Sequence, residues 1–389
     1  GGVIGTTVAY FLSAHSSYKR SIHDIIILES TSLASGASGK AGGLLALWAY
    51  PSCITPLSYR LHAELAAKHN GKERWGYRTL NCGSIRAVGK CSESIGAASL
   101  TGKTKKWVKL PKVSNPESSA RKIPHNLDWI EGDCIKEYQT MGTTETTAQV
   151  HPYLFTTSMA DLAVEAGAQV IFGRVTSINY NSEGIYGISY EERGSKASHD
   201  LVASDVILAA GPWTPQLFSP APINAVRAHS VVIEAEVSPY ALFSEISLPK
   251  QFGRQRHDPI VSPEIYARPD GTVYACGEAD STVSLPISSD LVLCDEDKCQ
   301  DIIDYVSTIS TILKDGKVLK KQACYLPSVE HGGGPLIGKT KVKGLLLATG
   351  HTCWGIQNCC ATGKLISEII FDGKAKSANI DILDPRRYM

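Results

Sequence analysis

The sequence predicts an α/β fold in which a doubly wound parallel sheet is joined to a second α+β domain with a mostly antiparallel sheet. Three observations lead to this prediction. A glycine-rich turn opens the chain and runs into an apolar helix at 3–15. Two apolar segments, 205–211 and 344–350, each stop abruptly at a glycine, which is typical of buried parallel strands. Between them, 221–290 carries short alternating segments that indicate antiparallel strands.

The opening turn has the spacing of a dinucleotide-binding motif. Gly2 and Gly5 fit the second and third glycines of G-x-G-x-x-G, which let the backbone approach a pyrophosphate and let the helix pack on a sheet. The helix N-terminus also offers free N–H groups to phosphates. A strand at 22–29 then ends in Glu29, about twenty residues after the turn, where this motif places a carboxylate for a ribose hydroxyl.

The motif is cut at its start. Its first glycine and the strand that feeds the turn would precede Gly1. Because that strand is central in a doubly wound sheet, we expect the sequence to be either a fragment of a longer chain or the product of a truncated gene model.

The later elements follow from apolar periodicity and glycine stops. The Ser-, Gly- and Ala-rich loop 31–43 would let backbone approach a flat ligand closely. Helices are expected at 57–70, 155–165, 299–314 and 355–370, a strand at 168–175, and a hairpin from 178–180 and 185–190. Residues 90–122, with the basic tract 103–107, indicate a surface excursion, and a solvated loop is favoured over contact with acidic lipid or RNA.

Composition excludes several classes of protein. A net charge of +1 gives no global field for nucleic acid or an anionic membrane, and no apolar stretch is long enough to span a bilayer. No signal peptide is visible, and the 11 cysteines lack the spacing of a disulfide scaffold, so we expect reduced thiols in the cytoplasm. Cys276, Cys294 and Cys299 are not spaced as zinc ligands, so no metal is expected.

Three separated blocks then point to one family: the glycine turn with Glu29, the segment 208–215, and the segment 350–356. In this order they resemble the FAD-dependent D-amino-acid oxidase family, which includes glycine oxidase and monomeric sarcosine oxidase. The segments 263–271 and 322–327 resemble a fungal branch of oxidoreductases, one of them linked to late-endosome-to-Golgi transport. The resemblance therefore implies FAD as the cofactor, with a trafficking partner and a peripheral endosomal location as further implications.

The resemblance also implies a domain division. A Rossmann-like FAD-binding domain of the glutathione-reductase type would be assembled from 1–60, 145–215 and 335–389. A substrate domain would be formed by 61–144 and 216–334.

By the same resemblance, a set of residues is expected to hold the cofactor. The loop after β-strand 22–29 would wrap the pyrophosphate, Val175 would lie by the adenine, and the turn after Gly350 would lie under the flavin pyrimidine, where a helix N-terminus stabilises negative charge. The expected residues are Gly2, Gly5, Glu29, Ser30, Ser35, Ser38, Gly39, Lys40, Ala41, Gly42, Val175, Ala210, Gly211, Trp213, Gly350, His351, Trp354, Gly355, Ile356 and Gln357.

The substrate side departs from the family pattern. Members that act on amino acids carry an Arg for the substrate carboxylate, but here the equivalent stretches are 324–328 and Cys353-Trp354. Arg268, Arg254 or Arg227 could substitute. Tyr266, Arg268 and His351 are the catalytic candidates, with a backbone-orienting role as the alternative for His351.

Two cysteine hypotheses remain beside these. Cys324 lies near the position at which the sarcosine-oxidase branch attaches its flavin covalently, but the local pattern is offset, so a non-covalent flavin is expected. The vicinal pair Cys359-Cys360 is interpreted as packing under a helix rather than as a redox pair.

The implied activity is oxidation of a C–N bond in a small-molecule amine or amino acid, by hydride transfer to flavin N5 with O2 as the acceptor. Two alternatives stay open: a dehydrogenase with another electron acceptor, and a catalytically weak flavin-fold protein with a trafficking or scaffold role. An NAD enzyme is disfavoured, because nothing in a simple nicotinamide fold requires the 350–356 block.

Overall fold

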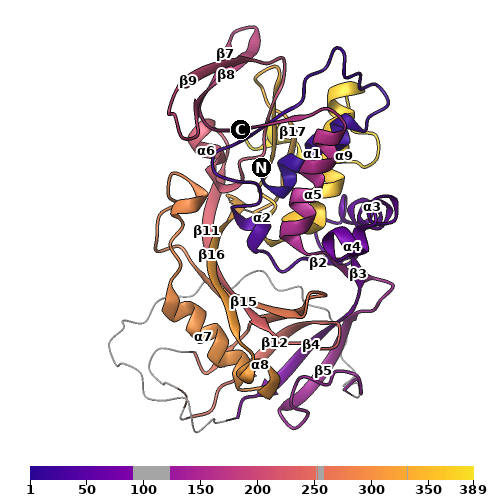
Figure 1. Cartoon of the computed structure of the whole chain (residues 1–389), viewed down its shortest axis with the longest axis vertical. Helices are drawn as coiled ribbons and strands as arrows, with labels where there is room; N and C mark the ends of the chain where they lie inside the picture. Colours follow the sequence, from indigo (N-terminus) through magenta and orange to yellow (C-terminus); the bar gives the residue numbers. More distant parts are fainter. Residues whose placement is uncertain (91–122, 251, 253–257, 331) are drawn as a thin grey trace.

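The computed structural model describes residues 1–90, 123–250, 252, 258–330 and 332–389. Apart from Lys90, the expected surface excursion at 90–122 and its basic tract lie outside the described residues. The described chain forms mixed α/β layers, with helices gathered on two small sheets at one end and a large sheet at the other (Figure 1). The predicted fold class is confirmed.

Two small sheets form the part next to the opening helix α1 (Val3–Ser13). One sheet has the order β1-β7-β8-β9, and β1 runs parallel to β7. The other has the order β10-β18-β17, and β10 runs parallel to β18. Their strands are β1 (Ile26–Glu29), β7 (Gln169–Asn181), β8 (Gly184–Glu192), β9 (Ser198–Val202), β10 (Val206–Leu208), β17 (Leu336–Lys339) and β18 (Leu345–Thr349). The expected hairpin at 178–190 is the antiparallel pair β7–β8.

Four long helices pack against one another beside these sheets: α1, α3 (Thr55–Lys68), α5 (Pro152–Glu165) and α9 (Gly355–Phe371) (Figure 1). Helices α1 and α9 approach closely at Gly363, where a Cβ would lie 2.7 Å from the Thr7 carbonyl oxygen. Glycine is therefore required there, because any side chain would force the helices apart. The contact brings the N-termini of α1 and α9 to the same side of the domain.

The large sheet has the order β16-β11-β15-β14-β12-β4-β5, with β13 paired to β12. All its pairs are antiparallel except β12 with β4, which confirms the mostly antiparallel prediction for 221–290. Its strands are β4 (Asn81–Val88), β5 (Ile135–Gly142), β11 (Ile223–Glu234), β12 (Tyr240–Ser247), β13 (Ile260–Val261), β14 (Glu264–Ala267), β15 (Thr272–Asp280) and β16 (Val318–Val329).

A third small sheet, β2-β6-β3, connects the two parts through β2 (Leu44–Ala46), β3 (Arg78–Thr79) and β6 (Thr147–Gln149). Short helices α2 (Ala37–Lys40), α4 (Gly71–Trp75) and α6 (Thr214–Leu217) lie in the connecting segments. The exact domain boundaries stay a prediction. No helix among the described residues has the length and apolar character needed to cross a membrane.

One expected helix is divided. The sequence predicts a single helix at 299–314, whereas the chain forms α7 (Glu296–Ser307) and α8 (Thr311–Asp315). Ser310 causes the break, because its hydroxyl donates to the Trp129 carbonyl and accepts from the Leu313 N–H, which caps α8. A Ser side chain that bonds the backbone in this way starts a new helix instead of continuing the old one.

Candidate cofactor and substrate site

A cavity of about 1350 Å³ runs from the opening turn to the large sheet. Residues of β1 and of β10 line it, so both small sheets contribute to its wall. It is also lined by most of the predicted cofactor residues, which are Gly2, Gly5, Glu29, Ser30, Ser35, Ser38, Lys40, Ala41, Gly42, Val175, Ala210, Gly211, Trp213, His351, Trp354, Gly355 and Ile356. Segments far apart in sequence thus converge on one hollow.

Three predicted cofactor residues stand behind this lining. Gly39 packs so tightly that a Cβ would lie 2.2 Å from the Ala34 carbonyl oxygen, and Gly350 has φ +81°, which favours glycine. Gln357 is buried, and its Oε1 accepts the Ala46 N–H at 2.7 Å. These residues shape the loops that border the cavity.

The opening turn and the loop after β1 are tied together at the start of α1. Gly2 is extended, with φ −79° and ψ 171°, and precedes the helix without a side-chain cap of its own. Ser38 of α2 supplies the cap, because its Oγ accepts the Val3 N–H at 2.8 Å. This hydrogen bond between Val3 and Ser38 holds the short helix α2 beside the N-terminus of α1, where the backbone N–H groups favour an anion.

Glu29 ends β1 with its carboxylate at the cavity. Its Oε1 accepts the Thr31 N–H at 2.8 Å and the Thr31 hydroxyl at 3.1 Å. Its Oε2 lies 3.1 Å from the Gly1 nitrogen. The carboxylate is therefore held in one orientation at the position where the motif requires a ribose acceptor.

A cluster of three hydroxyls adjoins Glu29, and the sequence predicted only Ser35 among them. Thr31, Ser35 and Ser289 contact one another through their oxygen atoms at 2.7–2.8 Å. Ser289 comes from the segment after β15, so it joins the large-sheet part to the cofactor loop. No local pattern marks Ser289, because its partners are more than 250 positions away, at separations of 258 and 254.

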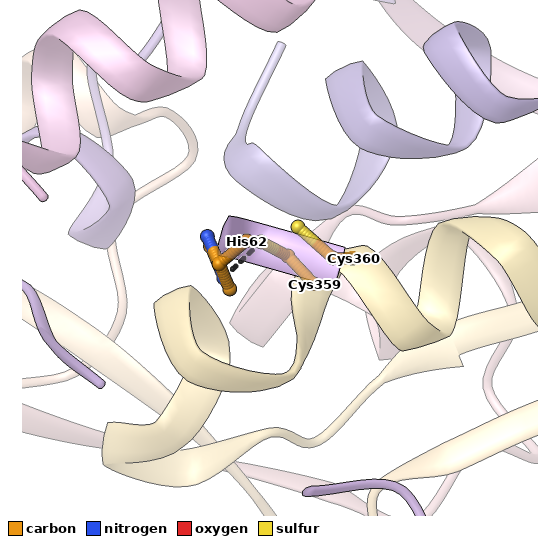
Figure 2. A group of neighbouring side chains, drawn as sticks. All are labelled: His62, Cys359 and Cys360. Carbon is orange, nitrogen blue, oxygen red and sulfur yellow. Dashed lines mark hydrogen bonds between the residues drawn. The ribbon is translucent and has the colours of Figure 1, made fainter. Parts of the chain in front are cut away.

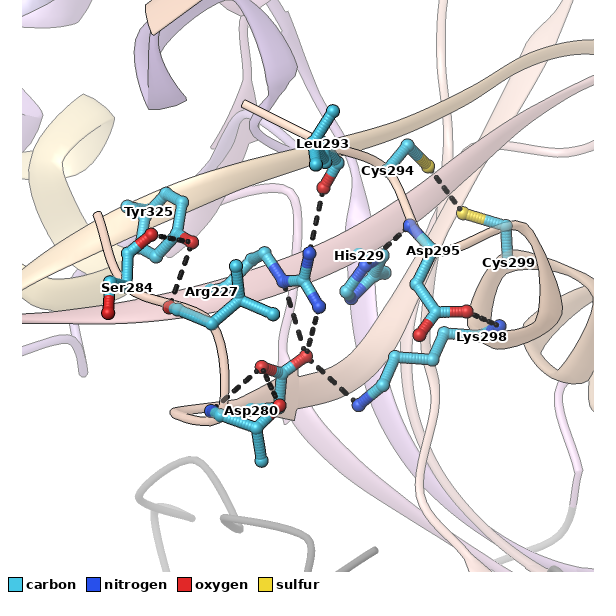
Figure 3. Close-up of polar contacts among 12 residues, drawn as sticks. Arg227, His229, Asp280, Ser284, Leu293, Cys294, Asp295, Lys298, Cys299 and Tyr325 are labelled. Atoms are coloured by element: carbon cyan, nitrogen blue, oxygen red, sulfur yellow. Dashed lines mark hydrogen bonds and ion pairs between the residues drawn. The ribbon is translucent and has the colours of Figure 1, made fainter. Parts of the chain in front are cut away.

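The segment that carries Ser289 is anchored by a buried ion cluster (Figure 3). Asp280 Oδ2 lies 3.1 Å from Arg227 Nη2 and 3.0 Å from Lys298 Nζ, and all three side chains are buried. Arg227 Nη1 also donates to the Leu293 carbonyl, and the Tyr325 hydroxyl donates to carbonyls of the same segment. Arg227, a sequence candidate for the substrate clamp, is thus bound within this cluster.

Trp213 contacts the segment after β15 that carries Ser289. Its Nε1 donates to the Pro286 carbonyl at 2.7 Å, from the 3₁₀ turn Gly211–Trp213 that follows β10. Gly211 has φ +53°, and a Cβ there would meet no atom within 4 Å. This turn therefore leaves open space on its cavity side, where a bound cofactor can approach its backbone.

The turn after β18 begins the helix α9. Gly350 and Thr352 both have positive φ, +81° and +52°, and Thr352–Trp354 form a 3₁₀ turn before the helix. A Cβ on Gly350 would lie 2.7 Å from Val329 Cγ2, so the turn has no room for a side chain. A positive φ at threonine is uncommon and is strained, which is a feature of functional sites.

His351 is among the residues that line the cavity, but its side chain bonds into the helix packing. Its Nε2 lies 2.9 Å from Thr362 Oγ1 inside the helix packing, and burial lowers the pKa of His351 to about 3. The imidazole is therefore neutral at ordinary pH. This arrangement favours the backbone-orienting alternative over proton transfer.

The burial of His351 makes a prediction about acid stability. Its folded pKa lies below the unfolded value of about 6.5, so the group stabilises the fold above that pH and loses this contribution as the pH falls toward 3. We expect the free energy of unfolding to fall by up to about 1.4 kcal/mol per pH unit below about pH 6.5. The fall should be smaller in His351→Asn, which lacks the imidazole. Urea titrations at pH 7.5 and 5 measure it, and equal losses in both proteins would contradict it.

The other substrate-side candidates, Tyr266 and Arg268, contact the loop 31–43. The Tyr266 ring packs on Gly42, where a Cβ would lie 2.2 Å from Tyr266 Cδ2, and its hydroxyl donates to Glu264. Arg268 Nη2 donates to the Ala41 carbonyl at 2.7 Å, and its guanidinium lies 5.1 Å from the Tyr274 ring centroid. Within the described residues Tyr266 lines the cavity and Arg268 does not. Arg254 lies outside the described residues.

His62, Cys359 and Cys360 form a buried group between α3 and α9 (Figure 2). Their ligand atoms lie within 4.8 Å of one another, which would permit a metal ion. However, His62 Nε2 and the Cys359 thiol both reach the Ile356 carbonyl oxygen, at 2.9 and 3.0 Å. These bonds support the interpretation as helix packing, and the expectation that the protein holds no metal stays a prediction.

Comparison with known proteins identifies the class. Residues 1–369 match the family model DAO, described as FAD dependent oxidoreductase, so the chain belongs to the DAO family of FAD-dependent oxidoreductases. The predicted family and FAD cofactor are thereby confirmed.

Two curated fungal relatives are each 35% identical to the chain. "Putative oxidoreductase TDA3" of Saccharomyces cerevisiae aligns over 497 residues, covering 100% of this chain and 93% of the relative. "Putative oxidoreductase C1F5.03c" of Schizosaccharomyces pombe aligns over 402 residues, covering 99% and 96%. The predicted resemblance of the chain to a fungal branch of oxidoreductases is thus confirmed.

Solved structures share the fold at low identity. Glycine oxidase from Geobacillus kaustophilus superposes with a TM-score of 0.70 at 17% identity, covering 100% of this chain and 97% of that one. Iminodiacetate oxidase from Chelativorans sp. BNC1 gives 0.69 at 15%, covering 99% and 97%.

The described residues fit FAD. The cavity is continuous from the opening turn to the large sheet, so an extended dinucleotide can lie along it. Glu29 presents its carboxylate to the cavity, and the helix starts of α1 and α9 border it, where their N–H groups favour negative charge. We assign the predicted cofactor residues to these roles as a proposal.

Proposed function

We propose that this protein oxidises the C–N bond of a small amine or amino acid with FAD as cofactor and O2 as electron acceptor. The observation that carries the proposal is the shared cavity, in which the cofactor-binding turns and the face of the large sheet border one space. When bound, FAD accepts a hydride from the carbon beside the nitrogen and passes the two electrons to O2, giving H2O2.

The chain itself orients the substrate and excludes water. When the substrate arrives as the neutral amine, its nitrogen lone pair forms a C=N bond as the hydride leaves, and water then hydrolyses the imine. For a neutral amine, the step therefore needs little proton transfer from the protein. Side chains of β12, β14 and β15 line the cavity on the sheet side, where they would orient the reacting carbon and shield it from water. The N-terminus of α9 favours negative charge at the flavin pyrimidine.

A flavin dehydrogenase with another acceptor is the second candidate. D-amino acid dehydrogenase of Rhizobium rhizogenes is 26% identical to this chain, and the match covers 59% of this chain and 50% of the relative. This similarity supports the dehydrogenase as a candidate. A catalytically weak scaffold in the cytoplasm, with an endosomal trafficking partner, is the third candidate. It rests on the fungal resemblance and on the missing Arg clamp for a substrate carboxylate. Glu29 and the glycine turns at Gly2 and Gly350 all match the family's cofactor-binding positions, which favours an enzyme over a scaffold.

A spectroscopic experiment separates these candidates. The purified protein should show flavin absorption, and acid precipitation should release the flavin into the supernatant. Anaerobic addition of an amine or amino-acid substrate should bleach the flavin, and air should restore the colour with formation of H2O2. Bleaching without peroxide would favour the dehydrogenase, and a protein that takes up no FAD would reject the proposal.

The same experiment tests Cys324, which lines the cavity on β16. Burial raises the pKa of its thiol to about 11, with Lys40 opposing the rise, so the thiolate is scarce at neutral pH. Flavin that stays in the acid pellet would contradict the expected non-covalent binding, and Cys324→Ser would then have to release it.

A further inference from the structure

Two cysteines meet at the start of α7 (Figure 3). The Sγ atoms of Cys294 and Cys299 lie 3.3 Å apart, in a hydrogen bond between two free thiols. A disulfide holds its sulfurs about 2.05 Å apart, so a displacement of roughly 1.3 Å would bring this pair to bonding distance. Neither cysteine is among the described residues that line the cofactor cavity, so the pair is separate from the site described above.

The two thiols differ in their access to solvent. Cys294 is half-buried, whereas Cys299 is 0% exposed. The Cys299 sulfur also lies 3.8 Å from the Ser230 carbonyl oxygen and 3.9 Å from that of Gln322, which places it against strands β11 and β16. An oxidant that arrives from solvent therefore meets Cys294 first, while the Cys299 sulfur stays in contact with it.

The contact also separates the acidities of the two thiols. The hydrogen bond from the Cys299 thiol lowers the pKa of Cys294, and this effect outweighs burial and the nearby carboxylates, which oppose it. The same contact, together with burial, raises the pKa of Cys299. Because the thiolate is the reactive form of a cysteine, Cys294 is the nucleophile of the pair, and Cys299 keeps its proton.

The residues beside the two cysteines are anchored in the buried ion cluster described above. The Leu293 carbonyl accepts a hydrogen bond from Arg227 Nη1 at 2.9 Å. Lys298 Nζ lies 3.0 Å from Asp280 Oδ2. These contacts hold both sides of the pair in place. Two reacting groups that are already held in contact lose little further freedom when a bond forms between them, which favours the reaction.

We propose that Cys294 and Cys299 are a peroxide-reactive pair that closes a reversible intramolecular disulfide. In the first step, the Cys294 thiolate attacks one oxygen of H2O2. An S–O bond forms, the O–O bond breaks, and the other oxygen takes up a proton and leaves as water. The sulfur is thereby oxidised to a sulfenic acid by two electrons, which reduce the peroxide.

In the second step, the Cys299 sulfur attacks the Cys294 sulfur. The S–S bond forms, the S–O bond breaks, and the hydroxyl group leaves with the Cys299 proton as a second water. Two thiols and one H2O2 thus give one disulfide and two water molecules. Disulfides of cytosolic proteins are usually transient and redox-sensing, which fits a pair that is reduced at rest. The inference does not depend on amine oxidation, because the peroxide can come from any source.

A peptide map of the oxidised protein tests the pair, because trypsin cleaves after Lys298, between the two cysteines. The FAD-loaded protein is treated with H2O2, its remaining thiols are blocked with N-ethylmaleimide, and it is digested without reductant. We expect the peptide that ends at Lys298 to be joined to the one that begins at Cys299, and dithiothreitol to separate them. Absence of this linked pair, at peroxide levels that oxidise the exposed Cys353, would overturn the proposal.

Two variants assign the roles within the pair. In Cys299→Ser the linked peptides should be lost, and the sulfenic acid should persist on Cys294, where dimedone traps it as a thioether. In Cys294→Ser both the linked peptides and the dimedone adduct should be lost. Labelling of Cys299 in Cys294→Ser, without labelling of Cys294 in Cys299→Ser, would overturn the assigned order of attack.

Cys276→Ser is the matched control, because Cys276 lies on the same tryptic peptide as Cys294. The linked peptides should form in this variant as in the wild-type protein. Their loss would identify Cys276 as the bonded sulfur and would overturn the proposal. Circular dichroism checks the fold of each variant, and the wild-type peptide map decides the question even where a variant fails to fold. Because the peroxide is added, the result is independent of whether the protein oxidises amines.

Discussion

Asp280→Asn should destabilise the protein by about 3–5 kcal/mol, because it removes the buried carboxylate that Arg227 and Lys298 share. Asp280 is 1% exposed, Lys298 3% and Arg227 4%, so water cannot replace the lost carboxylate. An exposed ion pair would contribute only up to about 1 kcal/mol. Urea unfolding followed by circular dichroism measures the loss of stability.

A matched control and a rescue make this prediction specific. Asp161→Asn, at an exposed position of α5, should change stability by less than about 0.5 kcal/mol. Replacing Arg227 and Lys298 with Met in the Asp280→Asn background should recover part of the loss, because the two buried cations that shared the carboxylate are then removed as well. A loss below about 1 kcal/mol in Asp280→Asn would show that solvent reaches the cluster.

The same carboxylate has a defined pH dependence. Although burial opposes its ionisation, contacts with Lys298 and Arg227 lower the pKa of Asp280 to about 2. A carboxyl whose pKa is lowered on folding stabilises the fold above its unfolded value, near 3.9, and loses this contribution as the pH falls toward 2. The difference between the wild-type protein and Asp280→Asn should therefore be full at neutral pH and shrink below about pH 4.

Glu29→Ala should raise the dissociation constant of FAD by about 10- to 100-fold, as expected for loss of a charge-assisted hydrogen bond. The substitution removes the proposed ribose acceptor and also leaves the Thr31 N–H without its 2.8 Å partner. The loop between β1 and α2 then loses the hydrogen bonds that tie Thr31 to Glu29. Reconstitution of apoprotein with FAD, followed by quenching of flavin fluorescence, measures the constant.

Glu183→Ala provides the control for this measurement. Glu183 is an exposed residue in the turn between β7 and β8, on the same sheet as Glu29, and it does not line the cavity. Its FAD affinity should equal that of the wild-type protein. An unchanged affinity in Glu29→Ala, with unchanged circular dichroism in both variants, would remove Glu29 from the cofactor site.

Several parts of the site could be predicted because they depend on neighbouring residues. Gly2 before α1, Glu29 at the end of β1 and the turn after Gly350 each follow a strand or open a helix, so short spacing rules locate them. The single helix expected at 299–314 was wrong for a local reason as well. Apolar periodicity continues through Ser310, but its hydroxyl bonds the Trp129 carbonyl and starts α8.

The substrate side could not be predicted from spacing. Arg268 and Arg227 are both possible clamps in the sequence, with Arg268 preferred. In the fold, Arg268 donates to the Ala41 carbonyl and Arg227 binds Asp280. His351 was placed correctly beside the turn, but the direction of its side chain depends on Thr362 in the following helix.

The sequence by itself determined the family, the cofactor and the alternation of elements, because glycine conformations, apolar periodicity and strand-to-turn stops are encoded within short windows. Only the tertiary structure decided which side chains share the cavity. Ser289 meets Thr31 across 258 positions, and Trp48 contacts Trp354 from another domain segment. Such contacts depend on how strands pair and helices pack, which short sequence windows do not encode. Buried polar groups and charges also require partners, and only the folded chain shows which residues supply them.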